Sequence, residues 1–238
     1  MSQLDDGVGV LPGSEPLLLI AERGWFAFYK PAGMNVHPAA ESDEQDLAAW
    51  VAGQPDLPDD LMLVNRLDRD TSGIVLFAQG QEKCAEAHRW FADEEVKKSY
   101  KALVYGKARR KGIIRKPLQD QRRKRSLPAV TRYRCVEALG PLSLLVVRPE
   151  SGRKHQIRRH LHSLGHSVVG DRRYRSKRRR SVPGFPGRLW LHSGFLELPD
   201  GFQVICPLPM ELEEHLDLLR DRYSNPVSEN DESLANKN

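Results

Sequence analysis

The chain has 238 residues, 39% of them hydrophobic and 29% charged, which is ordinary for a globular protein with its own core. No apolar run approaches the roughly 20 residues of a membrane span, and the N-terminus lacks the pattern of a signal peptide, so we expect a cytoplasmic protein without membrane contact. The three cysteines are far apart and show no CxxC spacing, which argues against a disulfide framework and a cysteine zinc site.

Charge is distributed very unevenly along the chain. The segment from Lys97 to Arg180 holds 27 of the 37 basic residues and 4 of the 32 acidic ones, a net charge of +23, and the rest of the chain carries −18. A block of one sign this large repels itself unless a polyanion relieves the repulsion. Nucleic acid is favoured over acidic lipid or an acidic protein as that polyanion, and its binding should depend strongly on salt.

The first half of the chain predicts short strands and two helices. Residues 1–16 are rich in Gly, Asp and Pro, and we expect a flexible N-terminal segment there. The hydrophobic patterns predict strands and helices in this order: strands at 17–21, 25–29, 61–64 and 74–78, a short helix at 46–51 and a longer one at 81–95. His88 falls on the apolar face of the longer helix, so we expect a packed histidine rather than a ligand.

One stretch of this half joins a charged turn to a fully apolar run. Asp68 precedes Asp70–Gly73, which have the residue types of turns, and residues 74–78 show no alternation and so predict a strand buried on both faces. Asp68 therefore lies on a loop beside a core strand, where functional residues are common. A local role as a turn-capping residue also explains an aspartate at this position.

The second half predicts more strands, two basic segments and two further helices. The strands are expected at 97–105, 131–138, 142–148, 167–170, 189–198 and 202–205. Two basic segments lie between them, an irregular arm at 107–125 that is a hairpin or a loop, and a loop at 171–187. One helix is predicted at 155–164, with Ile157, Leu161 and Leu164 toward the core. Another begins at Pro209.

Because most strands follow one another as hairpin neighbours with few helices between them, we predict an α+β fold with a mixed, largely antiparallel sheet. The domain is expected at residues 17–221, followed by a disordered acidic tail at 222–238.

Arg158 lies on the predicted helix 155–164, one residue from Ile157, and so at the edge of the buried face. Its rigid guanidinium could reach a carboxylate in a cleft, or the cationic helix could follow RNA phosphates; the residues alone favour neither. Four histidines gather nearby, but their spacing does not fit a metal site. Ser72 lacks the G-x-S-x-G pattern of a hydrolase, and no phosphate-binding glycine loop occurs.

Several short motifs, in order along the chain, resemble those of the RluA-type pseudouridine synthases. The stretch Asn65–Gly73 is similar to the H-R-L-D-x-x-T-S-G motif of that family. The other matching stretches are Tyr29–Gly33 with Val36–Pro38, Lys98–Tyr100, Gly152–Arg158, Leu189–Ser193 and Pro207–Pro209. Together they span roughly residues 17 to 215.

The resemblance implies an enzyme that isomerises uridine in structured RNA, in rRNA or tRNA, to pseudouridine. It implies a central catalytic cleft across the sheet, no cofactor and no metal. Asp68 would be the catalytic aspartate and Arg158 its partner, and Tyr100 would stack on the target base. Arg66 would help hold the flipped-out nucleotide or fill its vacated place; flipping is required because a stacked base cannot detach and reattach. Further RNA contacts are expected from the turn and helix start at Arg153, Lys154, His155 and Gln156.

Two residues depart from the family pattern. Asn65 replaces the usual His, which affects loop structure or RNA contact more than chemistry, and Lys154 replaces the usual Thr. We also expect a short, monomeric form of the family without an N-terminal S4 RNA-binding domain, similar to the TruC-like branch. A non-catalytic RNA-binding protein and a nucleic-acid hydrolase are the alternatives.

Overall fold

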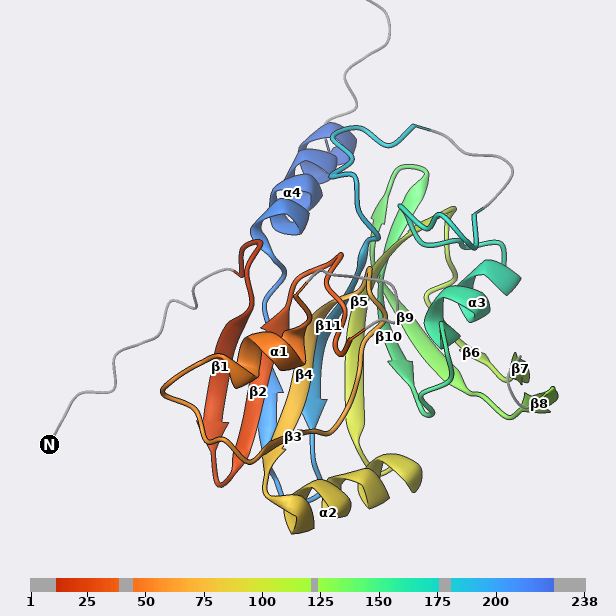
Figure 1. Ribbon diagram of the computed structural model, residues 1–238. Helices are drawn as coiled ribbons and strands as arrows, with labels where there is room; N and C mark the ends of the chain where they lie inside the picture. The colour runs from red at the N-terminus through yellow and green to blue at the C-terminus, as the bar shows by residue number, and fades with distance from the viewer. Residues whose placement is uncertain (1–11, 39–44, 121–123, 176–180, 225–238) are drawn as a thin grey trace, which may run out of the picture.

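The computed structural model describes residues 12–38, 45–120, 124–175 and 181–224 (Figure 1). The predicted acidic tail beyond residue 224 and the basic run Lys177–Arg180 lie outside the described residues. Of the helices in these ranges, none has the length and hydrophobicity needed to cross a bilayer.

One large sheet carries the fold. Its strands follow the spatial order β1-β2-β4-β11-β5-β10-β9-β6, with β3 paired to β4 and β12 paired to β11. Of these pairs, β4 with β11 is parallel and the others are antiparallel, so the predicted α+β fold with a mixed, largely antiparallel sheet is confirmed. The strands are β1 Leu17–Glu22, β2 Trp25–Lys30, β3 Leu61–Leu63, β4 Ser72–Gln79, β5 Lys97–Tyr105, β6 Lys111–Ile114, β9 Thr131–Leu139, β10 Leu142–Pro149, β11 Leu191–Glu197 and β12 Gln203–Ile205.

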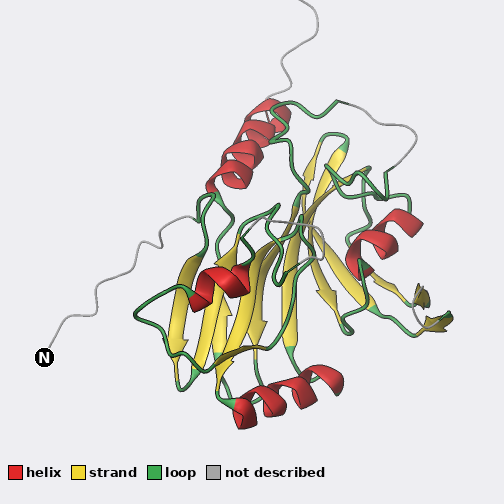
Figure 2. Ribbon diagram, in the orientation of Figure 1, coloured by secondary structure: helices red, strands yellow, loops and turns green. Residues whose placement is uncertain are grey.

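The helices flank this sheet (Figures 1 and 2). They are α1 Leu47–Ala52, α2 Gln81–Ala92, α3 Gln156–Ser163 and α4 Met210–Ser224. Helix α1 packs in a cluster with Val75, and α2 packs in a separate cluster with Leu76. Because neighbouring residues of a strand point to opposite faces, these two helices cover opposite faces of the sheet. Asp46 begins α1 by accepting a hydrogen bond from Ala49 N.

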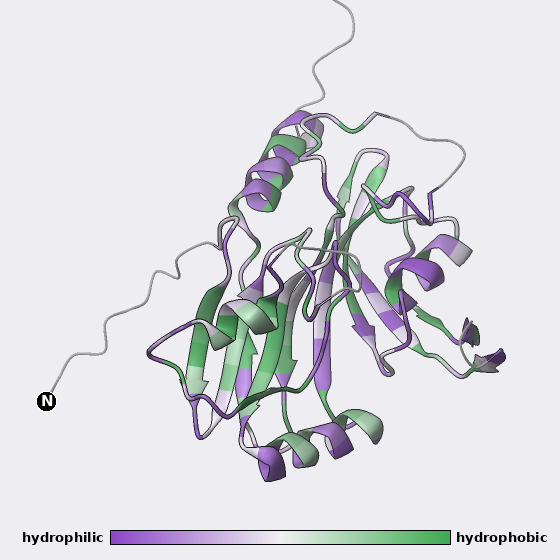
Figure 3. Ribbon diagram, in the orientation of Figure 1, coloured by the Kyte–Doolittle hydropathy of each residue, from purple (hydrophilic) through white to green (hydrophobic). Residues whose placement is uncertain are grey.

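Strand β4 lies between β2 and β11 in the sheet. It is buried on both faces from Ser72 to Ala78, which includes the residues 74–78 for which this burial is predicted. In Figure 3, most of β1, β2 and β4 has the green colour of hydrophobic residues. Strand β4 begins earlier than expected, because Ser72 and Gly73 belong to it rather than to the preceding turn. Gly73 has a φ of +120°, and a Cβ there would overlap the backbone of Ser193 on β11. A glycine therefore lets the parallel strands β4 and β11 approach closely.

The basic arm at 107–125 is expected as a hairpin or a loop, and its described residues contribute to both a sheet edge and a hairpin. Strand β6 joins the edge of the large sheet, and β7 Leu118–Asp120 pairs with β8 Arg125–Leu127 in a small separate hairpin. By contrast, the strand expected at 167–170 is reduced to an isolated bridge between Val104 and Val168.

Two side-chain predictions are corrected by the structure. His88 is exposed rather than packed, because α2 turns Cys84 and Ala87 to the core. Leu164 is 45% exposed, since α3 ends at Ser163 before a further turn could bury it. At the start of the described chain, the carbonyl groups of residues 13 and 12 accept hydrogen bonds from Tyr29 Oη and Met210 N.

Candidate active site

Asp68 lies on the loop that joins β3 to β4, and three anchors hold this loop. Asn65 Oδ1 accepts a hydrogen bond of 2.7 Å from Leu76 N on β4. Lys30, fully buried at the end of β2, donates from Nζ to the carbonyl oxygen of Arg69 at 3.0 Å. Leu67 packs into the core beside them. The loop is therefore fixed on both sides of Asp68, while the Asp68 side chain keeps 30% of its surface exposed.

The first anchor shows what the departure at position 65 does. The side-chain amide of Asn65 extends the β3–β4 pairing by one hydrogen bond into the loop, next to the bond from Val64 N to Leu76 O. Asn65 therefore supports loop structure directly, one of the two effects expected for this position.

The opposite wall of the site is the turn from β10 into α3. Gln156 is buried, and its Oε1 accepts from Ser151 Oγ and Arg153 N. Its Nε2 donates to Val130 O and Thr131 Oγ1. The expectation that Gln156 contacts RNA is wrong, because its amide is used inside the protein to fix the turn.

In this turn, the residue His155 has a rare backbone conformation. His155 precedes α3 with φ 53° and ψ 30°, the left-handed region that costs a non-glycine residue energy. Its ring Nε2 lies 3.7 Å from Asp68 Oδ1. Arg158 Nη1 lies 4.0 Å from Asp68 Oδ2. The structure thus brings Asp68, His155 and Arg158 together across the sheet, with a nitrogen group facing each carboxylate oxygen.

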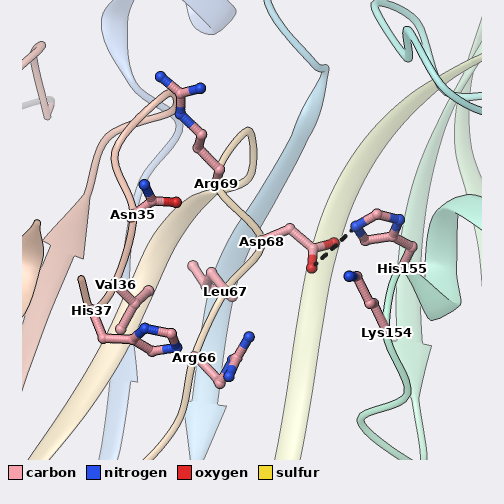
Figure 4. Close-up of a pocket in the computed structure, with 9 residues that line it drawn as sticks. All are labelled: Asn35, Val36, His37, Arg66, Leu67, Asp68, Arg69, Lys154 and His155. Carbon is pink, nitrogen blue, oxygen red and sulfur yellow. Dashed lines mark ion pairs between the residues drawn. The ribbon is translucent and has the colours of Figure 1, made fainter. Parts of the chain in front are cut away.

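Figure 4 shows the pocket that Asp68 and His155 line. Asp68 points across it toward His155, and the loop after β2 forms the opposite side. Cationic side chains surround the carboxylate. The lining residues are Asn35, Val36, His37, Arg66, Leu67, Asp68, Arg69, Lys154 and His155.

The nearest partner of Arg158 is an aspartate that the sequence analysis missed. Arg158 Nε and Nη2 donate to the two carboxylate oxygens of Asp171 at 2.8 and 2.9 Å. Both side chains are buried, to 6% and 0% exposure. Arg158 therefore pairs with Asp68 through Nη1 at 4.0 Å, as expected, but the rest of its guanidinium is held by Asp171, a second partner.

Asp171 also accepts from the backbone N–H groups of Arg173 and Tyr174 at 2.9 and 2.8 Å. These bonds fold the following loop back over the site. Tyr174 Oη then lies 3.1 Å from His155 Nδ1, and the Arg158 guanidinium lies 5.4 Å from the Tyr174 ring. A signal for Asp171 exists in the sequence, because it is one of four acidic residues in the +23 segment. An acid retained in such a segment is a candidate for a buried ion pair.

Burial and charge set the protonation of the site. Burial opposes ionisation of Asp171, but the Arg158 and backbone hydrogen bonds outweigh it, so the pKa of Asp171 lies below its ordinary value. Burial, together with the charges of Arg158, Arg173 and Lys154, lowers the pKa of His155 despite the attraction of Asp68. His155 is therefore neutral at pH 7 and carries a single N–H.

Tyr100 lies on β5, close enough to Asp68 to feel its charge, and packs against two of the hydrophobic clusters of the domain. Burial raises the pKa of Tyr100 to about 12, and the charge of Asp68 acts in the same direction. The phenol is therefore protonated at neutral pH. Its ring presents a flat apolar surface close to a carboxylate.

The remaining predicted RNA contacts are exposed. Arg66 and Lys154 lie at the pocket from opposite walls, whereas Arg153 lies outside the pocket lining and donates to Pro128 O. The described residues contain no group of three or more His, Cys, Asp or Glu side chains arranged to hold a metal ion. His160 instead bonds to Thr131 Oγ1 and Lys116 O in the interior.

An accessible carboxylate facing a buried arginine, within a cationic rim and beside an aromatic ring, defines an enzyme site for a polyanionic substrate. Residues 24–163 match the family described as RNA pseudouridylate synthase. The chain belongs to the RNA pseudouridylate synthase family.

Individual relatives agree with this assignment. An uncharacterized RNA pseudouridine synthase of Chloroflexus aurantiacus is 37% identical over 217 residues, which cover 82% of this chain and 66% of that protein. The tRNA pseudouridine synthase C of Haemophilus ducreyi is 32% identical over 71% of this chain and 79% of its own length. The ribosomal large subunit pseudouridine synthase D of Zymomonas mobilis is 36% identical over 63% and 53%. The chain thus spans about half to four fifths of these relatives.

The solved structure of human RNA pseudouridylate synthase domain containing 4 has the same fold, with a TM-score of 0.72 over 85% of this chain and 92% of that chain. The two are 22% identical in sequence.

Proposed function

We propose that this protein converts uridine within RNA to pseudouridine, with Asp68 as the catalytic carboxylate. One observation carries the proposal: Asp68 is the accessible carboxylate of the pocket, and its two oxygens face His155 and Arg158. The reaction moves the attachment of the base from nitrogen to carbon within one nucleotide. It adds no group and changes no net oxidation state, so it requires no cofactor.

Asp68 can act in two ways. Its carboxylate attacks the ribose C1′ as the glycosidic bond breaks, or it accepts a ribose proton. Both require an ionised carboxylate, and the guanidinium of Arg158 at 4.0 Å favours that form. Arg158 is itself held in place by Asp171, so it is a positioning residue with a fixed direction toward Asp68.

Tyr100 is proposed to stack on the target base after the base leaves its helix. A base that must detach, rotate and reattach has to leave the stack, and aromatic rings stabilise flipped bases by stacking. Arg66, at the open side of the pocket, is proposed to hold the flipped nucleotide or fill its vacated place.

The RNA is proposed to be rRNA or tRNA, which are named as substrates of the relatives. Its phosphates would contact Arg153 and Lys154 beside the pocket, with His155 at the floor. We further propose that the protein acts in the cytoplasm as a monomer.

The test is release of tritium from RNA labelled at uridine C5, since attachment of the ribose at that carbon displaces its hydrogen. Wild-type protein is incubated with labelled total rRNA and, separately, with labelled total tRNA. Release is expected with at least one of them and is expected to vanish in Asp68→Ala.

Two controls make the result specific. Arg89→Ala, on the exposed side of α2, should release tritium at the wild-type rate. The RNA product should have unchanged mass and length, because hydrolysis would cleave it. Equal release by Asp68→Ala and wild type would refute the catalytic role of Asp68.

A further inference from the structure

A group of exposed basic residues lies on the sheet away from the pocket. It comes from four neighbouring strands, β5, β10, β9 and β6, and we call it the back stripe. Its members are Lys101, Lys111, Arg132, Arg134 and Arg148, all of them exposed.

Strand register aligns these side chains. Val146 lies opposite both Lys101 and Arg134, and Arg134 lies opposite Lys111, so one row crosses all four strands. Arg148 lies opposite Arg132 in the next row of the same face. With strands about 4.8 Å apart, the first row is roughly 14 Å long.

The back stripe is on the opposite face from the pocket. Tyr100, Val147 and Tyr133 occupy the intervening row, each directly opposite the next. Val147 and Tyr133 are buried in the cluster that contains Ile157 of α3. Since side chains alternate between faces, the pocket and α3 lie on one side of these strands and the stripe lies on the other.

The stripe places like charges side by side. Lys111 is directly opposite Arg134, and Arg132 is directly opposite Arg148. Such pairs destabilise a sheet. Among the described residues, Glu150 reaches Arg132, and no acidic side chain forms an ion pair with the other four.

The same sheet pairs its cations elsewhere. Lys97 on β5 is directly opposite Glu197 on β11 and binds it at 2.6 Å. Arg220 of α4 binds Glu137 of β9 at 3.0 Å. Within the described part of the chain, Lys111 and Arg134 of the back stripe are thus directly opposed cations without an acidic partner, and an external polyanion would relieve their repulsion.

We propose that the back stripe binds the phosphate backbone of the substrate RNA, at a site separate from the pocket. The inference rests on RNA being the substrate. The RNA would pass around the β6 edge of the sheet, where the positive charge continues along exposed residues of the arm, Arg109, Arg110, Arg115 and Lys116. The arm contacts α3 through Arg159, which donates to Gln119 O, so this path joins the two faces.

Salt dependence of binding tests the proposal. The double variant Lys111→Gln/Arg134→Gln is compared with Arg89→Gln/Arg222→Gln, which removes the same charge from exposed positions of α2 and α4. The probe is total tRNA, and in parallel total rRNA. The stripe variant is expected to bind roughly tenfold more weakly, and its plot of log affinity against log salt should be shallower by about 1.4 to 1.8 for two lost phosphate contacts. The matched control should differ little from wild type.

Acylation of lysines in wild-type protein locates the contact without any substitution. RNA is expected to protect Lys101 and Lys111 but not Lys97, which is paired with Glu197 and lies at the far end of β5. Unchanged labelling of Lys101 and Lys111, with equal salt slopes for the two double variants, would overturn the proposal. Protection by vesicles of anionic lipid but not by RNA would also overturn it, in favour of a membrane contact.

This outcome is separable from the proposed activity. If tritium release depends on Asp68 but the stripe variant binds RNA as tightly as wild type does, the back-stripe proposal alone is refuted. If RNA does not protect the lysines of the back stripe and no RNA releases tritium, both the back-stripe proposal and the proposed activity are refuted.

Discussion

Two aspartates share one arginine in this protein, and they are held in opposite ways. Asp171 has no exposed side-chain surface and accepts four hydrogen bonds of 2.8 to 2.9 Å, two from Arg158 and two from backbone N–H groups. Asp68 is 30% exposed, and the nitrogens that face it lie at 3.7 Å on His155 and 4.0 Å on Arg158. One carboxylate is saturated by the protein, and the other retains free acceptor positions.

The difference separates a structural carboxylate from a reactive one. A buried charge needs its full set of partners to be tolerated, and Asp171 has them. A carboxylate that attacks a carbon or accepts a proton needs free lone pairs and access. Asp171 aligns the guanidinium of Arg158 without occupying Nη1, and Arg158 can therefore serve both carboxylates at once.

The largest expected effect is on turnover, from Asp68→Asn. The amide keeps the size of the side chain but cannot act as nucleophile or base, so tritium release should fall by about 10⁴-fold or more. The free energy of unfolding in urea should change by less than about 0.5 kcal/mol, because the partners of this side chain among the described residues, His155 and Arg158, lie at 3.7 and 4.0 Å. A change above about 2 kcal/mol would show that Asp68 is structural and would remove the contrast with Asp171.

The next effect is on stability, from Asp171→Ala. This change leaves the buried guanidinium of Arg158 without its main partner, which costs about 3 to 5 kcal/mol. Turnover should also fall, because Arg158 loses its alignment. Urea unfolding followed by tryptophan fluorescence measures the first effect, and tritium release at saturating RNA measures the second.

A second variant separates loss of the charge pair from general damage. In Arg158→Met/Asp171→Ala neither charge is buried, so the double variant should be less destabilised than the sum of the two single variants by about 1 to 3 kcal/mol. Its turnover should remain low. Additive stability losses would mean that the ion pair is not the origin of the effect.

Acidification should show the same contrast on a smaller scale. Because the pKa of Asp171 is lower in the folded protein than its ordinary value of 3.8, its stabilisation is complete above that value and is lost as pH falls toward the folded pKa. In that window, unfolding free energy of wild type should fall by up to about 1.4 kcal/mol per pH unit more than that of Asp171→Asn. Parallel pH curves for the two proteins would contradict the lowered pKa.

The contrast also shows what sequence can and cannot predict here. The alternation and turn patterns predicted the sheet strands, because each depends on neighbours within a few residues. The same reasoning placed Asp68 on a loop beside the buried strand β4. The expected boundary failed at Ser72 and Gly73, because the approach of β11, more than a hundred residues away, draws them into the strand.

The partner of Arg158 could not be predicted from local pattern. Asp171 is thirteen residues further on, in a loop without periodicity, and its bond to Arg158 depends on how that loop folds back. Gln156 shows the opposite error. Its place in a motif suggested an RNA contact, whereas burial assigns its amide to the turn that orients His155. A motif identifies important positions, but burial decides whether a side chain faces substrate or protein.

The smallest expected effect comes from Tyr174→Phe. It concerns Asp68 Oδ1, the carboxylate oxygen that faces His155. The phenylalanine keeps a ring beside Arg158 but loses the hydroxyl that lies 3.1 Å from His155 Nδ1. One lost hydrogen bond is worth about 1 kcal/mol, so turnover should fall about fivefold while RNA affinity stays unchanged. His155→Gln, which removes the ring that Tyr174 holds, is the partner variant. If Tyr174 acts by orienting His155, Tyr174→Phe should have no further effect in the His155→Gln background. Multiplicative losses would instead mean that Tyr174 acts through Arg158, the arginine that Asp68 shares with Asp171.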